Sequence, residues 1–231
     1  MPSAVRLVIL GRQGAGKGTQ CLRLARHYAV PHVATGDMLR AMHRSGSELA
    51  RRLATYMRAG ELVPDEVVIA VVAHRLGQDD TQCGGFILEG FPRTAAQAEG
   101  LSALLAPSDI DLCLDLEVDP EVVLARLSKR RVCRECSTNY SVDRPPRRNW
   151  TCDVCGGEVR QRDDDTEEAI TRRLALYEAE TAPLVAWYRQ RDKLVIVKGS
   201  GAPDTVTTRL VRAIDHRVVR TEEEGAGAAQ R

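Results

Sequence analysis

A glycine-rich segment near the start of the chain has the residue types and the spacing to bind phosphate. Residues 11–19 read Gly-Arg-Gln-Gly-Ala-Gly-Lys-Gly-Thr, which fits a frame of glycine, four residues, glycine and lysine. In this frame backbone N–H groups surround the phosphates, the next helix adds its N-terminal donors, and Lys17 reaches the β and γ phosphates. The strict motif has Ser or Thr directly after the lysine, whereas here Gly18 precedes Thr19. The segment therefore predicts a nucleotide site in which the hydroxyl for magnesium is displaced by one position.

Four of the seven cysteines have the spacing of a metal site. Two Cys-x2-Cys pairs, fifteen residues apart, are formed by Cys133, Cys136, Cys152 and Cys155. Two such turns supply four thiolates for a tetrahedral zinc ion, which would be structural because no coordination position stays open. The segment between the pairs has almost no apolar residues, so the metal would supply its folding energy. The pattern does not distinguish zinc from iron.

Two other interpretations of the cysteine segment stay open. A pair of disulfides is disfavoured because the cytosol is reducing. A zinc ribbon for nucleic acid is suggested by the basic and aromatic residues Arg144, Arg147, Arg148 and Trp150. The net charge of +1 gives no support for a general nucleic-acid binder.

The remaining cysteines and the histidines show no ligand spacing. We expect the cysteines to be buried free thiols, and the histidines to be structural or surface residues. These residues are Cys21, Cys83, Cys113, His27, His32, His43, His74 and His216.

The elements that must position the phosphate loop alternate between strands and helices. Continuous apolar runs predict strands at 5–10, 85–88, 110–116 and 194–197. Helical periodicity covers 17–28, 65–76, 94–105, 120–129, 166–190 and 204–216. This alternation predicts an α/β fold with a doubly wound parallel sheet, whose ligands bind beyond the carboxyl ends of the strands.

Two segments interrupt the alternation and are interpreted as insertions. Residues 36–64 are helical without an obvious buried strand, and residues 131–163 are rich in Cys, Pro, Gly and Arg. The predicted core is therefore discontinuous and consists of 1–35, 65–130 and 164–219. Residues 220–231 are acidic and then rich in Gly and Ala, so we expect a disordered tail.

The composition fits a globular protein in the cytoplasm. Of 231 residues, 43% are hydrophobic and 28% are charged, which is enough apolar content for a core. No stretch reaches the roughly 18 apolar residues that span a bilayer, and the N-terminal apolar run is too short for a signal peptide. We expect no membrane and no nucleic-acid partner.

Three motifs together resemble the signatures of the adenylate kinase family. They are residues 14–20 (Gly-Ala-Gly-Lys-Gly-Thr-Gln), 34–40 (Ala-Thr-Gly-Asp-Met-Leu-Arg) and 90–94 (Gly-Phe-Pro-Arg-Thr), in the family's order and approximate spacing. The resemblance covers about residues 4–218, and the cysteine segment is similar to the metal-bearing lid of one branch, the long bacterial form. It implies a monomer that transfers a phosphoryl group reversibly from ATP, with Mg²⁺, to AMP, giving two ADP. Residues 36–64 would close over AMP and 131–163 over ATP, which excludes water.

The resemblance also implies a role for individual residues. Those expected at ATP are Gly14, Ala15, Gly16, Lys17, Gly18, Thr19, Arg126, Arg130, Asn139, Tyr140 and Gly201. Those expected at AMP are Thr35, Arg40, Glu61, Leu62, Val63, Gly90, Phe91, Pro92, Arg93, Gln97, Arg162 and Arg173. The catalytic set is Lys17, Arg93, Arg130, Arg162 and Arg173. Arginines suit this task because phosphoryl transfer requires positioning and the stabilisation of charge on the phosphate oxygens.

Two residues depart from the family pattern. Gln13 stands where the phosphate loop usually has Pro, which changes loop stiffness but removes no phosphate donor. Glu89 stands where an Asp usually helps to place magnesium through water, so its additional methylene must be accommodated.

Three rival functions remain at this stage. A UMP or CMP kinase is disfavoured by Thr94, where the pyrimidine enzymes often carry Asn. A zinc-ribbon NTPase that binds nucleic acid is disfavoured by the neutral charge. A phosphate-loop protein with a purely structural role is disfavoured by the intact Lys17 and Arg93.

Overall fold

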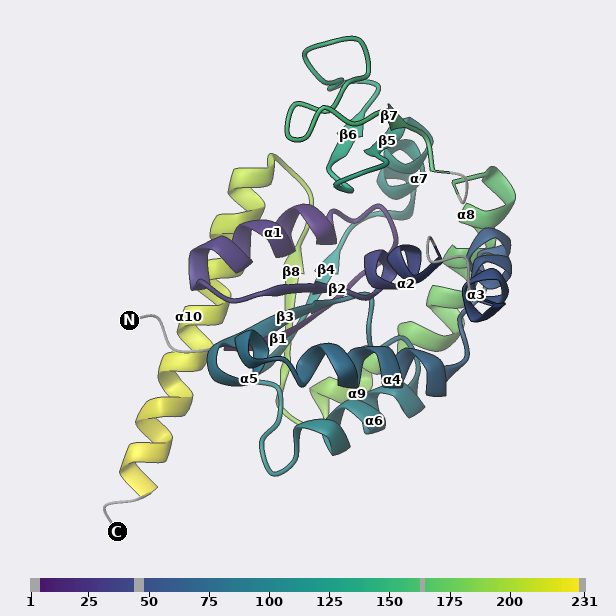
Figure 1. Cartoon of the computed structure of the whole chain (residues 1–231). Coiled ribbons are helices and arrows are strands. Elements are labelled where there is room, and N and C mark those ends of the chain that lie inside the picture. The colour runs from purple at the N-terminus through teal and green to yellow at the C-terminus, as the bar shows by residue number, and fades with distance from the viewer. Residues whose placement is uncertain (1–4, 44–47, 163–164, 229–231) are drawn as a thin grey trace.

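A five-stranded parallel sheet forms the centre of the molecule (Figure 1). The computed structural model describes residues 5–43, 48–162 and 165–228. From one edge to the other, the strands are β2 (His32–Ala34), β3 (Gly85–Glu89), β1 (Val5–Leu10), β4 (Leu112–Glu117) and β8 (Leu194–Lys198). The connections after β1 and β4 lead toward opposite edges of the sheet, and such a switch point is where open parallel sheets bind ligands.

Helices cover both faces of this sheet, because alternate residues of each strand point to opposite sides. Val5, Leu7 and Ile9 pack in one core cluster, and Val8 and Leu10 pack in the other. The first cluster is covered by α1 (Lys17–Tyr28), α7 (Pro120–Lys129) and α10 (Pro203–Ala228). The second is covered by α4 (Asp65–Leu76), α6 (Ala95–Leu105) and α9 (Pro183–Arg189). The predicted doubly wound α/β fold is confirmed.

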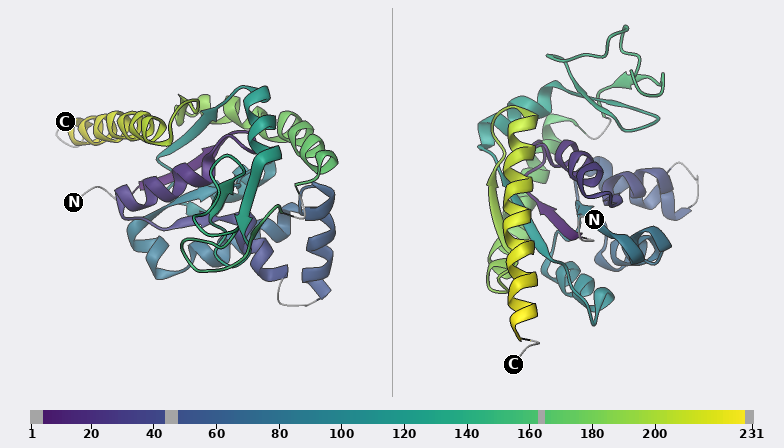
Figure 2. Two further views of the ribbon diagram at one scale, coloured as in Figure 1. Left: turned by 90° about the horizontal axis from the view of Figure 1, so that it is seen from above. Right: turned by 90° about the vertical axis from the view of Figure 1, so that its left-hand side faces the viewer.

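Two segments extend from this arrangement. Helices α2 (Thr35–His43) and α3 (Glu48–Ala59) follow β2, and the short α5 (Asp79–Gly84) precedes β3. A separate antiparallel sheet has the order β6-β5-β7 and consists of β5 (Arg130–Cys133), β6 (Asn139–Ser141) and β7 (Val159–Arg160). In Figure 1 this small sheet lies at the top of the molecule and α4 and α6 lie below the central sheet, and the right-hand view of Figure 2 shows the small sheet at the same end. The exact limits of the two insertions stay predictions.

Three parts of the described chain differ most from the sequence expectation, and α5, β5, β6 and β7 were not predicted as separate elements. Strand β2 was not predicted, and it has only three residues, of which Val33 alone is fully buried. The helix predicted over 166–190 is divided into α8 (Glu167–Leu176), a π-helical turn η1 (Tyr177–Thr181) and α9. The division comes just before Pro183, which has no N–H to continue the α-helical hydrogen bonds.

The third difference is at the C-terminus. A disordered tail was expected from residue 220, whereas α10 continues to Ala228. The glutamates at 222–224 and the alanines are good helix formers, and extension of a helix already held by packing adds one hydrogen bond per residue. Among the described helices, none is both long and apolar enough to cross a membrane.

Candidate functional site

The phosphate loop joins the carboxyl end of β1 to the first turn of α1. Gly14 and Gly16 have φ angles of +85° and +103°, which side-chain-bearing residues rarely adopt. A Cβ atom at Gly14 would also lie 2.9 Å from Cγ of Leu127. Lys17 Nζ folds back over the loop and donates to the carbonyl oxygens of Gly11 (2.6 Å) and Arg12 (2.9 Å). Desolvation of this half-buried amine lowers the pKa of Lys17 to about 8, against an opposing effect of the Glu89 carboxylate.

A cavity of about 920 Å³ lies beside this loop, at the carboxyl ends of the central strands. Most of the residues predicted for the nucleotide sites line it. These are Gly14, Gly16, Lys17, Gly18, Thr19, Thr35, Arg40, Glu61, Leu62, Val63, Gly90, Pro92, Arg93, Gln97, Arg126, Arg130, Asn139, Tyr140, Arg162 and Arg173. A nucleotide pair needs a cleft of this size and polarity.

Three predicted residues do not line the cavity. Ala15 is buried under the loop, where its carbonyl oxygen accepts a hydrogen bond from Arg126 Nη1 at 3.1 Å. Phe91 is fully buried in the second core cluster. Gly201 lies in the loop after β8 with a φ of +114° and no neighbour within 4 Å of where its Cβ would be. Ala15 and Phe91 therefore contribute backbone and packing in this structure.

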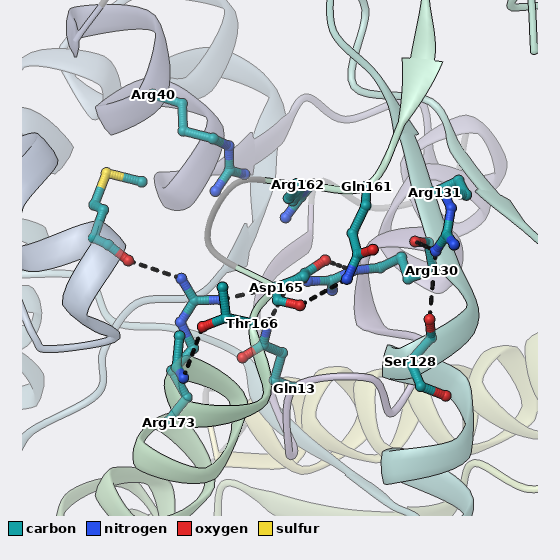
Figure 3. A network of polar contacts seen from close by, with 12 residues as sticks. Gln13, Arg40, Ser128, Arg130, Arg131, Gln161, Arg162, Asp165, Thr166 and Arg173 are labelled. Carbon is teal, nitrogen blue, oxygen red and sulfur yellow. Dashed lines mark hydrogen bonds and ion pairs between the residues drawn. The ribbon is translucent and has the colours of Figure 1, made fainter.

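A group of arginines converges around a buried carboxylate at the edge of the cavity (Figure 3). Arg130 Nε donates to Asp165 Oδ2 at 2.8 Å, its Nη2 bonds the other oxygen, and Arg173 Nη1 lies 3.7 Å from Asp165 Oδ1. The Asp165 side chain has no exposed surface. Across the cavity, Arg40 bonds Asp37, which lies 4.0 Å from Arg162. The carboxylates of Asp165 and Asp37 thus lie beside four of the predicted arginines, which all line the same cavity.

Gln13 and Asp165 contribute more to this group than the sequence indicated. When the Gln13 amide is oriented to satisfy its neighbours, its oxygen accepts from Arg130 Nη2 (2.8 Å) and from Arg173 Nη1 (2.9 Å). The departure from proline therefore adds an acceptor for two arginines. Asp165 directly precedes the N-cap of α8 but does not cap it, because Thr166 accepts the capping hydrogen bond from the Ala169 N–H. The signal for Gln13 was its place in the phosphate loop, whereas none of the sequence motifs includes Asp165.

Arg93 shows how strongly positive this space is. Its Nε donates to the Gly90 carbonyl oxygen at 2.8 Å, and its guanidinium faces the cavity. Desolvation, and then the charges of Arg173 and Arg40, lower the pKa of Arg93 to about 10. A cation whose pKa is lowered by burial and by neighbouring cations in a cleft indicates a site for a polyanion.

Several polar groups close to Arg93 and to the cavity lining are buried and fixed. Gln97 is 1% exposed, accepts from the Arg93 N–H (2.8 Å) and donates to Asp65 Oδ1 (2.7 Å). Thr94 Oγ1 donates to the other oxygen of Asp65 at 2.9 Å. The buried hydroxyl of Thr35 has no hydrogen-bond partner among the described residues. A buried polar atom without a partner is uncommon and marks a place that a ligand can complete.

Glu89 and His32 form a pair beside Gly18. His32 Nε2 lies 2.9 Å from Glu89 Oε2, and a Cβ at Gly18 would lie 3.3 Å from both carboxylate oxygens. Burial opposes ionisation of Glu89, but the hydrogen bond from His32 and the charge of Lys17 prevail, and the pKa of Glu89 is lowered. His32 therefore lies at the cavity and bonds a predicted site residue, although its sequence spacing gave no indication of this.

The four predicted metal ligands meet in the small sheet. The Sγ atoms of Cys133, Cys136, Cys152 and Cys155 all lie within 4.8 Å of one another, and none of the four is in a disulfide. Two of the separations are 3.4 Å (Cys133 to Cys155) and 3.5 Å (Cys136 to Cys152). Thiolates at about 2.3 Å from a tetrahedral ion lie slightly farther apart than this, so the arrangement fits zinc.

Tyr140 connects the cysteine cluster to the cavity. It lines the cavity, and its hydroxyl donates to Cys152 Sγ (3.4 Å) and accepts from the Asp153 N–H (2.8 Å). The sequence had placed Tyr140 only near the nucleotide. Contacts of this kind around metal ligands fix their orientation.

The fold and the cavity define a class of protein. A parallel sheet, a phosphate loop after its first strand and a convergent group of arginines are the features of a phosphotransferase that acts on nucleotides. A model of the family "Adenylate kinase" matches residues 9–193. The chain is 46% identical to the adenylate kinase of Moorella thermoacetica over 213 residues, which is 91% of this chain and 98% of that protein.

Two further relatives agree. The adenylate kinase of Caldicellulosiruptor saccharolyticus is 44% identical over 213 residues, covering 91% of this chain and 99% of that protein. The adenylate kinase of Streptomyces griseus subsp. griseus is 42% identical over 214 residues, covering 91% and 97%. The chain belongs to the adenylate kinase family, and its activity is phosphoryl transfer from ATP to AMP.

Proposed function

We propose that Lys17, Arg93, Arg130, Arg162 and Arg173 hold the phosphates of both nucleotides and neutralise the transferred group. The observation that carries this proposal is the convergence of these five cations on one cavity, where Arg93 is surrounded by like charges. Phosphoryl transfer develops negative charge on oxygens between donor and acceptor, so fixed cations there lower the barrier. No general base is needed, because an AMP phosphate oxygen is already a nucleophile.

Carbonyl and carboxylate oxygens within the chain contact these cations. Lys17 bonds two carbonyl oxygens of the loop, and Asp165 and Gln13 hold Arg130 and Arg173. We infer that the β and γ phosphates replace the carbonyls at Lys17, while Asp165 keeps the arginine planes oriented. Prepositioned donors of this kind do not have to reorganise during the reaction.

The two nucleotides would occupy opposite parts of the cavity. We propose that the loop, Arg126 and Asn139 bind ATP, and that Gly201, which lies outside the cavity lining, approaches it only if its loop moves. The acceptor part would use Thr35, Arg40 and the backbone of 61–63 for AMP. Support comes from the unpartnered Thr35 hydroxyl and from the fixed Gln97 amide, whose second N–H is available to an adenine edge.

Magnesium and zinc have separate places in this proposal. Magnesium enters with ATP, neutralises phosphate charge, and would be held through water by Glu89, whose carboxylate is ionised and lies over Gly18. A structural zinc would be bound by the four cysteines. The residues fit both ions, and neither ion takes part in an acid–base step.

We also propose that the enzyme is a monomer in the cytoplasm that acts on free nucleotides. The near-neutral net charge of +1 favours this over a nucleic-acid partner. Closure of 131–163 over ATP and of 36–64 over AMP would exclude water from the transferred group.

An acceptor panel tests the assignment. With ATP and Mg²⁺, we expect kcat/KM for AMP to exceed the values for UMP, CMP and GMP by about a hundredfold, because a buried polar pocket rejects partners that leave its groups unpaired. Separate measurement of each nucleoside diphosphate product gives the readout. Equal efficiency with UMP would overturn the proposed acceptor pocket.

The pH dependence tests the place of Lys17. Below pH about 8 its amine is charged in the free enzyme, and above that pH it loses the proton and its attraction for phosphate. We therefore expect kcat/KM for ATP to fall about tenfold per pH unit above this value, while kcat stays level to higher pH because bound phosphates keep the lysine protonated.

The control for this prediction is a cation that does not titrate. In Lys17→Arg the guanidinium stays charged, so any remaining activity should lack the alkaline fall. A wild-type kcat/KM that is level to about pH 10, where ordinary lysines titrate, would contradict the prediction.

A further inference from the structure

Three metal-ligating side chains outside the cysteine cluster meet beside the phosphate loop. The ligand atoms of Cys21, His32 and Glu89 all lie within 4.8 Å of one another. His32 Nε2 and Glu89 Oε2 are 2.9 Å apart. A thiolate, an imidazole nitrogen and a carboxylate oxygen are the three kinds of ligand that zinc takes from proteins. Magnesium is unsuited to this set because it requires oxygen ligands.

Each of the three residues comes from a different rigid element. Cys21 is fully buried on the face of α1 that packs on the sheet. His32 is on β2 and Glu89 ends β3, and the register pairs Ala34 with Glu89, so His32 and Glu89 are diagonal neighbours on one face. Ligands held on helices and strands keep their geometry better than ligands on loops. The arrangement does not depend on the lid.

The group is open on one side only. His32 and Glu89 line the large cavity with side-chain exposures of 13% and 22%, whereas Cys21 closes the other side. An ion held by three side chains would therefore have its fourth position toward the cavity, as in zinc sites with an exchangeable ligand. Two anionic ligands offset the charge of a divalent ion, which reduces the repulsion from the nearby Lys17.

We propose that Cys21, His32 and Glu89 form a second metal site, which takes a thiophilic divalent cation such as Zn²⁺, and that its occupation inhibits the enzyme. Binding replaces the proton of the Cys21 thiol, which passes to the solvent. The ion then holds the Glu89 carboxylate and removes it from the hydrated magnesium of ATP. The inhibitory part rests on the magnesium role proposed above for Glu89, whereas the binding part does not.

Binding is tested without nucleotide, using Co²⁺ as a spectroscopic probe on protein whose cysteine cluster carries zinc. We expect one equivalent of Co²⁺ to give a thiolate-to-metal absorption band in the wild type. The band should be absent in Cys21→Ala. It should be retained in the control variant Cys113→Ala, which also loses a fully buried free thiol. A band of equal strength in Cys21→Ala, or no band in the wild type, would overturn the metal site.

Inhibition is tested with buffered free Zn²⁺ at saturating ATP, AMP and Mg²⁺. Each variant is compared with its own activity without zinc. We expect half inhibition of Cys21→Ala to require a free Zn²⁺ concentration at least about tenfold higher than for the wild type or Cys113→Ala. The reason is that loss of the Cys21 ligand weakens the metal site. If Co²⁺ binds at Cys21 but zinc inhibits all three proteins equally, the site stands. The inhibitory role is then refuted, whereas the magnesium role of Glu89 is tested separately by the Mg²⁺ requirement of Glu89→Gln without zinc.

Discussion

Lys17→Ala is expected to lower kcat by roughly a thousandfold, which corresponds to about 4 kcal/mol of transition-state stabilisation. Lys17 is the cation of the phosphate loop, and its amine already bridges the carbonyl oxygens of Gly11 and Arg12 beside the cavity. Alanine leaves the loop its backbone donors, so ATP should still bind, although more weakly. The loss should therefore appear mainly in kcat, where charge on the transferred group is no longer neutralised.

The control for Lys17→Ala is a lysine away from the cavity. Lys198 is exposed at the end of β8, so Lys198→Ala should keep wild-type kcat. Circular dichroism and melting temperature establish that Lys17→Ala is folded, and a coupled assay of ADP formation measures the rate. Turnover of folded Lys17→Ala near that of the wild type would rule out the proposed role.

The parts of the fold that the sequence predicted best are those with a strong local signal. Strand β1 and helix α1 have the predicted limits, because an apolar run ends at glycine and a helical pattern begins at Lys17. Strand β2 lacked such a signal. Its three residues include one buried side chain, and its position depends on pairing with β3, with His32 opposite Ile87. Pairing of this kind is a tertiary interaction that a short segment does not encode alone.

The candidate site also has a part that the sequence predicted and a part that it did not. The phosphate loop is continuous in sequence, so its frame alone identified it. Arg130 is more than thirty residues from Arg162 and Arg173 along the chain, and only resemblance brought the three together before the structure was known. The contacts that hold them were not foreseen. Gln13 and Asp165 are 152 residues apart, yet both contact Arg130. Side-chain pairs across such separations follow from packing, which motif spacing does not contain.

His32 illustrates the same limit for metal ligands. Spacing identifies ligands that share one turn, as in the Cys-x2-Cys pairs. Cys21, His32 and Glu89 lie on three elements with no common spacing, so each was interpreted separately. A buried thiol and a surface histidine are reasonable interpretations of either residue alone. Only the parallel pairing of β2 with β3 under α1 shows that the three belong together.

The cysteine cluster should have the largest effect on stability. Among the residues that the structure describes, the core around it consists of Cys133, Cys152 and Val159, with Tyr140 packed against them. So few apolar contacts cannot offset the entropy lost in ordering the lid residues 131–162, at about 1–2 kcal/mol per residue. A metal ion bound by the four cysteines would add stability that the small core lacks.

Cys133→Ser is therefore expected to release the metal and to lower the melting temperature by about 10 °C, the shift that a loss of about 3–4 kcal/mol produces in a chain of this size. Treatment of the wild type with a strong chelator should give the same shift and should change the variant no further. Val154→Ser is the matched control, because Val154 lies in the turn between Cys152 and Cys155 and is 71% exposed. Elemental analysis that finds no stoichiometric metal in fresh wild-type protein would refute the zinc assignment. An unchanged melting temperature in metal-free Cys133→Ser would instead show that the lid folds without the ion.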